Sequence, residues 1–113
     1  KNKLAAIARV YATKQSTQVE LADIYIKEEY RGKVGPNDIK WSDSLMIAML
    51  KAIQRRNFKK IWLWTTVENI PAIKLYEKYG FKSKDFPDNK KNQLYKKYKW
   101  LKGRELIYMT RNL

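Results

Sequence analysis

A run of β-branched and aromatic residues, KIWLWTTV, occupies positions 60–67 near the middle of the chain. This composition is typical of a strand that is buried on both faces of a sheet. Pro71 follows at a place where the first turn of a helix tolerates proline, and Leu75 and Tyr76 continue at helical spacing until Gly80. We therefore expect a buried strand that leads within a few residues into a short helix.

Similar patterns predict the elements on either side of this centre. Apolar residues at helical spacing after Ser42 indicate an amphipathic helix that ends near Arg56. Further strands are expected over residues 3–14, 18–26, 94–101 and 105–111, with turns at 15–17 and at Lys102-Gly103. The predicted fold class is α+β, in three layers around a mixed central sheet. The predicted order is β-β-α-β-α-β-β, in a single domain over residues 1–113.

Composition narrows the chemistry that is open to the chain. It contains no cysteine and no histidine, which excludes disulfides, thiol nucleophiles, Cys/His metal sites and any catalytic triad with an imidazole base. No apolar run approaches the roughly 20 residues that span a bilayer, so we expect a cytoplasmic protein without a membrane partner. The net charge of +14 favours polyanionic partners, nucleic acid among them, although a lysine-rich composition also produces an ordinary solvated surface.

A strand, a glycine-containing loop and a helix start follow one another between positions 21 and 44. The strand is LADIYI, the loop opens with Tyr30-Arg31-Gly32-Lys33, and Ser42-Asp43-Ser44 are expected to cap the helix. A pyrophosphate is held well at such a helix start, because unpaired backbone amides and the helix dipole point at it. The same succession also serves many α/β proteins simply as a turn.

The segment ENIPAIKLYEKYGF, residues 68–81, follows directly on the expected buried strand. Asn69 at the strand end can satisfy backbone groups where a sheet splays, and Tyr76 is placed to direct its hydroxyl back over that end. A structural explanation competes with this one, since a tyrosine at helical spacing is often an amphipathic residue of the core.

Together, LADIYIKEEYRGK and ENIPAIKLYEKYGF resemble the two cofactor motifs of the GNAT superfamily of acyl-CoA-dependent N-acyltransferases, over roughly Leu4 to Phe81. The resemblance implies acetyl-CoA as the cofactor, with its pantetheine arm along the strand edge at Ile24, Tyr25 and Ile26. Asn69 and Ala72 would border the arm. The pyrophosphate would meet Arg31, Gly32, Lys33, Gly35, Ser42, Asp43 and Ser44.

The same resemblance implies two catalytic roles. A carboxylate at the position of Glu20 serves in several family members as the base that removes a proton from the acceptor amine, usually through water. Tyr76 would protonate the leaving thiolate, and a backbone amide around Ile26 or Lys27 would polarise the thioester carbonyl. Glu20 can equally be an exposed carboxylate of a hairpin, close to lysines.

Two departures from the family pattern are visible. The loop usually follows Q/R-x-x-G-x-G/A, whereas Val34 and Pro36 stand in the fourth and sixth places, and the extra residues VGPNDIKW precede Ser42. Pro36 has no N–H to offer a phosphate. Family members also usually begin with a strand and one or two helices before the residues near Leu4, so we expect an N-terminally truncated fold.

The expected function is transfer of an acetyl group from acetyl-CoA to a primary amine of an unidentified acceptor, either a small molecule or a protein. The alternative is a catalytically inactive GNAT-like module that binds nucleic acid. Its supporting feature is the tract Lys90–Lys102, in which Tyr95, Tyr98 and Trp100 interleave with lysines in a way that suits base stacking and phosphate contact. An edge strand guarded by lysines explains the same tract.

Overall fold

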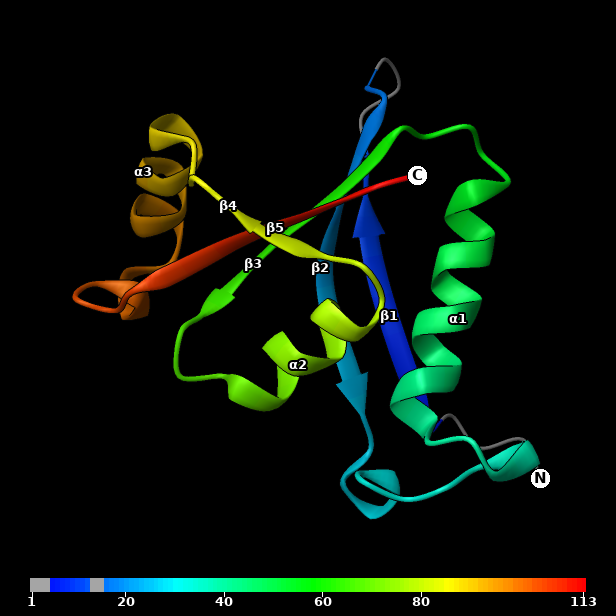
Figure 1. The fold of residues 1–113 in the computed structure, drawn as a ribbon. Helices are drawn as coiled ribbons and strands as arrows, with labels where there is room; N and C mark the ends of the chain where they lie inside the picture. The colour runs from blue at the N-terminus through cyan, green and yellow to red at the C-terminus, as the bar shows by residue number, and fades with distance from the viewer. Residues whose placement is uncertain (1–4, 13–15) are drawn as a thin grey trace. The chain divides into compact units, whose positions relative to one another are not determined.

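The computed structural model describes residues 5–12 and 16–113 (Figure 1). Its strands are β1 Ala6–Tyr11, β2 Gln18–Ile26, β3 Lys60–Thr66, β4 Lys82–Lys84 and β5 Leu106–Asn112. Its helices are α1 Trp41–Gln54, α2 Ile70–Lys78 and α3 Asp88–Lys97, together with three short 3₁₀ turns, η1 Glu28–Tyr30, η2 Pro36–Asp38 and η3 Lys99–Leu101. The ends of the first predicted strand, and Gln15 of its turn, lie outside the described residues.

The five strands form one mixed sheet in the order β1-β2-β3-β5-β4. The β1–β2 and β4–β5 pairs are antiparallel, whereas β2 and β3 are parallel. The predicted α+β class is therefore confirmed. The chain divides into two compact units, the first comprising Lys1–Trp62 with Arg111–Leu113 and the second comprising Leu63–Thr110. Each unit is described by itself below.

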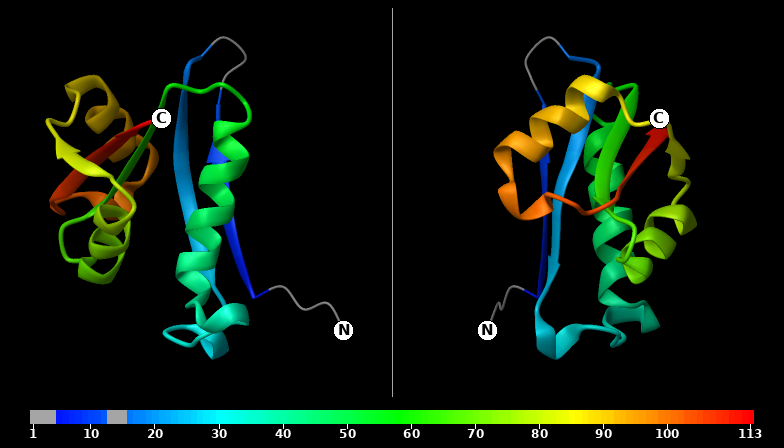
Figure 2. Two further views of the ribbon diagram at one scale, coloured as in Figure 1. Left: turned by 45° about the vertical axis from the view of Figure 1, so that its right-hand side comes forward. Right: turned by 90° about the vertical axis from the view of Figure 1, so that its left-hand side faces the viewer.

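In the first unit, α1 lies along the β1–β2 hairpin (Figures 1 and 2). The helix buries Met46, Met49, Leu50 and Ile53, which recur at the spacing of one helix face. On the sheet, the buried side chains are Val19, Leu21 and Ile61. Burying each such side chain, compared with leaving it exposed, stabilises the fold by roughly 1.5–3 kcal/mol. Because this energy favours placing all four side chains of α1 on one helix face, their spacing in the sequence was enough to predict the helix.

The second unit has its core around β5. Leu106, Tyr108 and Met109 are buried on this strand, together with Leu63 of β3 and Leu101 of η3. β3 itself alternates between buried and half-buried positions, so the expectation that both of its faces are buried is wrong. The half-buried face carries aromatic side chains, and the Trp64 ring lies 5.8 Å from that of Tyr98 in the same unit.

The structure corrects the prediction for residues 82–101. The strand expected over residues 94–101 is wrong, because α3 and η3 occupy this stretch, and the strand that pairs with β5 is the short β4. The order is thus β-β-α-β-α-β-α-β. Leu94, Tyr95 and Tyr98 are half-buried and lie at helical spacing, so they form one face of a helix rather than alternating across a strand.

Candidate functional site

The predicted site residues fall into two groups, one in each unit. The first unit holds the strand edge, the loop and the helix start, namely Glu20, Ile24, Tyr25, Ile26, Arg31, Gly32, Lys33, Gly35, Ser42, Asp43 and Ser44. The second unit holds Asn69, Ala72 and Tyr76, all at α2. Within the first unit, hydrogen bonds join Arg31 to Ile26 of the strand edge and Lys33 to Trp41 at the helix start.

The backbone of β2 has one edge that faces β1 and one that faces away from it. The N–H of Lys27 donates to the carbonyl of Ala5 at 2.8 Å, while Ile26 stands opposite Ala6. Successive residues of an antiparallel strand alternate in direction, so Ile24 and Ile26 direct their N–H and C=O groups away from β1. The backbone amides around Ile26 and Lys27 were the candidates for polarising the thioester carbonyl. The Lys27 amide is bonded to Ala5, whereas the Ile26 amide lies on the edge of β2 that faces away from β1.

A β-bulge in β2 sets the direction of the side chains on this edge. Asp23 stands opposite Arg9, but Leu21 stands opposite Val10, so Ala22 is an extra residue of β2. A one-residue change of register moves every following side chain to the other face of a sheet. Tyr25 therefore lies on the face opposite to buried Leu21, and it is 49% exposed.

Glu20 lies just before this bulge, at the end of the parallel ladder. In the part of the chain that the structure describes, the ladder joins Gln18, Val19 and Glu20 to the first three residues of β3. Glu20 stands beside Trp62 of β3 and opposite Tyr11 of β1, on the face away from buried Val19. Its side chain is half-buried.

Arg31 is held close to the outward edge of β2. Its Nε atom donates to the carbonyl of Ile26 at 2.8 Å, and its guanidinium lies over the Tyr25 ring at 5.4 Å from the ring centre. Gly32 follows with a φ of +69°, a conformation that favours glycine. The arginine side chain is exposed and remains able to offer its terminal nitrogens to an anion.

The extra residues of the loop fold back on themselves. Val34 and Lys40 form an antiparallel bridge, the N–H of Gly35 donates to Ile39 at 2.7 Å, and the N–H of Trp41 donates to Lys33 at 3.3 Å. The inserted residues therefore form a closed loop whose two ends meet. As a result, Lys33 lies beside Trp41, the first residue of α1. The amide of Gly35 is engaged inside this loop.

Trp41 keeps the insertion closed by packing. A Cβ atom at Gly35 would lie 2.8 Å from Cε2 of the Trp41 ring, so only glycine fits there. The Tyr30 ring meets Trp41 edge-on, with the ring centres 5.3 Å apart. This cluster was missed from the sequence, where the only signal was an aromatic residue directly before a helix.

The start of α1 differs from the predicted cap. The helix begins at Trp41, Lys40 is its N-cap, and no side chain makes a capping hydrogen bond, so the expected cap at Ser42-Asp43-Ser44 is wrong. The first helical bond runs from the Ser44 N–H to the Lys40 carbonyl at 3.0 Å. The N–H groups of Ser42 and Asp43 precede it and have no acceptor within the helix.

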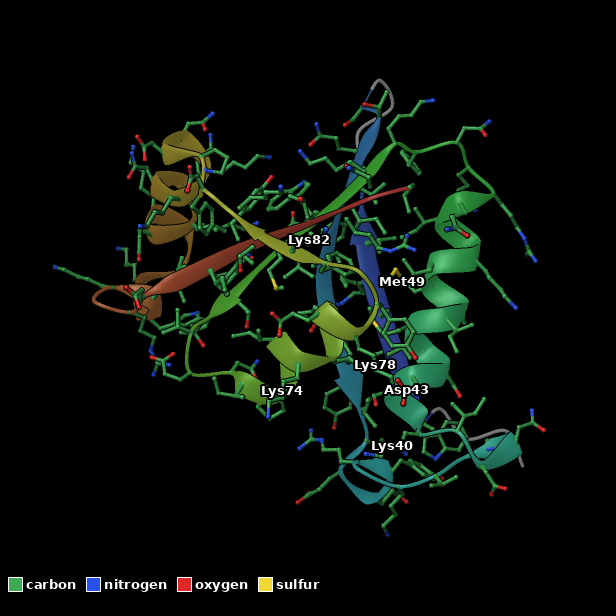
Figure 3. The ribbon with its side chains drawn as sticks, viewed as in Figure 1. Lys40, Asp43, Met49, Lys74, Lys78 and Lys82 are labelled. Atoms are coloured by element: carbon green, nitrogen blue, oxygen red, sulfur yellow. The ribbon has the colours of Figure 1, made fainter. Side chains whose placement is uncertain are left out.

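This helix start suits a phosphate group. Amides without a helical acceptor and the positive end of the helix dipole attract anions, and Arg31 and Lys33 add positive charge close by in the chain. Asp43, which is labelled in Figure 3, is only 8% exposed, so its carboxylate is turned into the protein. These residues fit a pyrophosphate, with Ser42 and Asp43 as backbone donors.

In the second unit, Asn69 connects β3 to α2. Its Nδ2 atom donates to Oγ1 of Thr65 at 3.4 Å, and its carbonyl accepts the N–H of Ile73 at 3.1 Å. Thr65 is a buried residue that sequence reasoning did not single out. Ala72 is half-buried in the first turn of α2.

Tyr76 is placed by the way α2 ends. The N–H of Phe81 donates to the Tyr76 carbonyl at 3.0 Å, the N–H of Gly80 donates to Glu77 at 3.1 Å, and Gly80 has a φ of +88°. This is a Schellman motif, and its usual apolar contact is present because the Tyr76 and Phe81 rings lie 5.8 Å apart. Since Phe81 is only 2% exposed, the tyrosine ring is fixed against the core.

Two further properties concern the described part of the chain. None of its helices is long and apolar enough to cross a bilayer. Its acidic residues nowhere gather in a group that could hold a metal ion.

Comparison with known proteins finds a match in sequence for one part of the chain and matches in fold for most of it. The Acetyltransferase (GNAT) family model matches residues 40–81, which run from the N-cap of α1 to the Phe81 that closes α2. No curated protein matches the chain in sequence.

Solved structures match the fold over nearly the whole chain. Nourseothricin acetyltransferase has a TM-score of 0.70 at 21% identity, covering 96% of this chain and 57% of that one. The ribosomal-protein-S18-alanine N-acetyltransferase from Escherichia coli has a TM-score of 0.68 at 21% identity, covering 96% and 61%. A Bacillus subtilis acetyltransferase in complex with CoA has a TM-score of 0.74 at 19% identity, covering 99% and 71%.

The chain thus spans about three fifths of the length of the first two structures. At these identities the likeness concerns the fold, whereas the family model concerns the sequence of the α1, β3 and α2 segment. The resemblance to the GNAT family is therefore confirmed in sequence for residues 40–81, and the chain as a whole has the fold of these acetyltransferases.

Proposed function

We propose that this domain takes part in transferring an acetyl group from acetyl-CoA to a primary amine of a small-molecule or protein acceptor. The observation that carries the proposal is the family match over residues 40–81, because this segment contains both the α1 start and the Tyr76 segment. The complex of the Bacillus subtilis structure with CoA supports the choice of cofactor. When bound, acetyl-CoA supplies an acetyl group activated as a thioester.

Binding of the cofactor is assigned to backbone groups and to two cations. The amides of Ser42 and Asp43, helped by Arg31 and Lys33, would hold the pyrophosphate at the α1 start. The outward backbone groups of Ile24 and Ile26 would pair with the pantetheine arm in the manner of an added strand. Asn69 and Ala72 are proposed to border the arm.

The chemistry is assigned to two side chains. A protonated amine cannot attack a carbonyl, so Glu20 is proposed to accept the amine proton, through a water molecule where needed. As the new N–C bond forms and the C–S bond breaks, the Tyr76 hydroxyl is proposed to give its proton to the departing sulfur. The Ile26 amide, on the outward edge of β2, is the donor we assign to the carbonyl oxygen.

A calorimetric titration with acetyl-CoA tests the proposal. We expect one-to-one binding that largely survives at about 0.2 M salt, because directed amides are less sensitive to screening than diffuse lysine contacts. Arg31→Ala should weaken binding about three- to tenfold, whereas Arg55→Ala, an exposed arginine at the other end of α1, should leave it unchanged. The proposal fails if acetyl-CoA does not bind at low salt or if both variants weaken it equally.

Several other expectations stay proposals. The two units are proposed to form a single domain, because β3 runs through both of them. A cytoplasmic location is proposed from the sequence alone. Nucleic-acid contact is proposed from the net charge of +14 and from the aromatic and lysine residues of the tract Lys90–Lys102, which forms a helix and a turn rather than the edge strand of the competing explanation.

A further inference from the structure

A groove of about 710 Å³ lies in the second unit, where α3 passes into η3 and the turn before β5. Its lining residues are Asn92, Tyr95, Lys96, Lys99, Lys102 and Gly103. Half of them are lysines and none is acidic. Small-molecule sites commonly have volumes of roughly 300–1,000 Å³, so the groove is large enough for a small organic ligand.

The surrounding sequence makes the groove strongly basic. Residues 89–104 contain no aspartate or glutamate, and their seven cationic residues are Lys90, Lys91, Lys96, Lys97, Lys99, Lys102 and Arg104. In the described residues, no ion pair joins Lys96, Lys99 or Lys102 to a carboxylate. Three like charges that face one hollow repel one another, and a bound anion would relieve that repulsion.

The backbone that carries these lysines is held in place by hydrogen bonds within the protein. The Tyr95 hydroxyl donates to the Arg104 carbonyl at 2.6 Å, which ties α3 to the turn before β5. The buried Leu101 anchors η3, its N–H donates to Tyr98 at 3.0 Å, and its carbonyl accepts the N–H of Arg104 at 2.8 Å. The backbone positions of the lysines therefore do not have to be assembled by a ligand, which lowers the cost of binding.

We propose that this groove binds a small phosphorylated molecule, with its phosphate among Lys96, Lys99 and Lys102. Lysine binds phosphate as a point charge with three donors, and a doubly charged phosphate matches a group of lysines better than a single carboxylate does. The Asn92 amide can add a donor, and the Tyr95 ring offers an apolar wall to the organic part of the ligand. The site uses none of the residues proposed for acetyl transfer and does not depend on that function.

Nuclear magnetic resonance titrations of the protein with inorganic phosphate and with adenosine monophosphate, both at constant ionic strength, test the proposal. We expect saturable one-to-one binding, with amide shifts concentrated in residues 92–104. The triple variant Lys96→Gln, Lys99→Gln, Lys102→Gln should lose about tenfold or more in affinity for adenosine monophosphate.

The matched control replaces three exposed lysines elsewhere, Lys51→Gln, Lys59→Gln and Lys84→Gln, which changes the net charge equally. This control and Arg31→Ala should each change the affinity less than about twofold, and circular dichroism should show both triple variants folded. Equal losses in the two triple variants, or binding that does not saturate, would overturn the site. An affinity for single-stranded oligonucleotides that rises with their length and exceeds that for adenosine monophosphate would overturn it in favour of nucleic acid.

Discussion

The carbonyl, the ring and the hydroxyl of Tyr76 have different roles. Its carbonyl accepts the Phe81 N–H and its ring lies against the Phe81 ring, so both help to close the C-terminal end of α2. The proposed proton transfer needs only the phenol oxygen. The structural and the chemical explanations of this residue are therefore compatible, and a substitution that removes the oxygen alone can separate them.

Tyr76→Phe keeps the ring contact and deletes the proton donor. We expect turnover to fall about 10²- to 10⁴-fold, with little change in the KM for acetyl-CoA and in the denaturation midpoint. Steady-state kinetics and urea denaturation of the same preparation measure the two effects. Tyr79→Phe, at the same end of α2, should leave turnover unchanged. An undiminished rate in Tyr76→Phe would make the residue a packing residue only.

At the scale of elements, the loop before α1 shows how an insertion can close on itself ahead of a helix. The bridge between Val34 and Lys40 closes the extra residues into a loop of their own, and the hydrogen bond from the Trp41 N–H to the Lys33 carbonyl joins the two ends of this loop. Asn37 and Asp38 turn the tip with positive φ angles. The extra residues are thus confined to this closed loop, and the Arg31 side chain is bonded to Ile26 of β2, outside it.

Gly35→Ala should open this loop. The added Cβ would lie 2.8 Å from the Trp41 ring, and such overpacking costs about 1–3 kcal/mol of unfolding free energy. In a Trp41→Leu background the same change should cost less, because the ring that it meets is gone. Urea denaturation of the wild type, both single variants and the double variant gives this coupling energy. Equal costs in both backgrounds would mean that the close approach to Trp41 is unimportant.

The elements also differ in how far their sequences reveal them. β2 was predicted with the bounds that it has, and α2 was predicted to end at Gly80, two residues beyond its last residue Lys78, because alternation, apolar spacing and a glycine stop are local signals. The strand expected at 94–101 failed because aromatic residues among lysines satisfy both a strand and a helix pattern. Contacts such as that of Tyr98 with Trp64 favour the helix, and they join residues far apart in the chain.

On the scale of the whole molecule, β5 contributes most to one of the two cores. Leu106, Tyr108, Met109 and Thr110 of this strand are buried, and the Phe86 ring lies 5.1 Å from that of Tyr108. Burial raises the pKa of the Tyr108 phenol above its ordinary value, because the charged form loses its solvation. The folded state therefore disfavours ionisation of this residue more than the unfolded state does.

This difference predicts how stability depends on alkaline pH. The contribution of Tyr108 is complete below the unfolded pKa of about 10 and is lost as pH rises from there through the raised folded pKa. Tyr108→Phe cannot ionise, so its unfolding free energy should fall less steeply with pH above about 10 than that of the wild type, by up to about 1.4 kcal/mol per pH unit. Urea denaturation at several pH values measures both slopes.

The slope, rather than the absolute stability, is the test, because the substitution also removes a polar atom from the core. Parallel curves for the wild type and Tyr108→Phe would show that Tyr108 does not contribute to alkaline unfolding.

The sequence by itself determined the α+β class, the bounds of β2, the place of the α2 segment and the exclusion of imidazole and thiol chemistry. All of these follow from composition, from a periodicity within one element, or from a motif that is contiguous in the chain. The Tyr76 and Arg31 candidates come from such contiguous motifs, which is why they could be named without a structure.

Only the tertiary structure decided the bulge at Ala22, the closed insertion before Trp41, the start of α1 and the lysine groove beside α3. Each depends on which partner a backbone or side-chain group finds elsewhere in the chain. Arg9 and Asp23, for example, are opposite only because the β1–β2 register shifts there, although they lie 14 residues apart. A local pattern states what a segment prefers, whereas hydrogen bonding and packing between segments select the register and the end points.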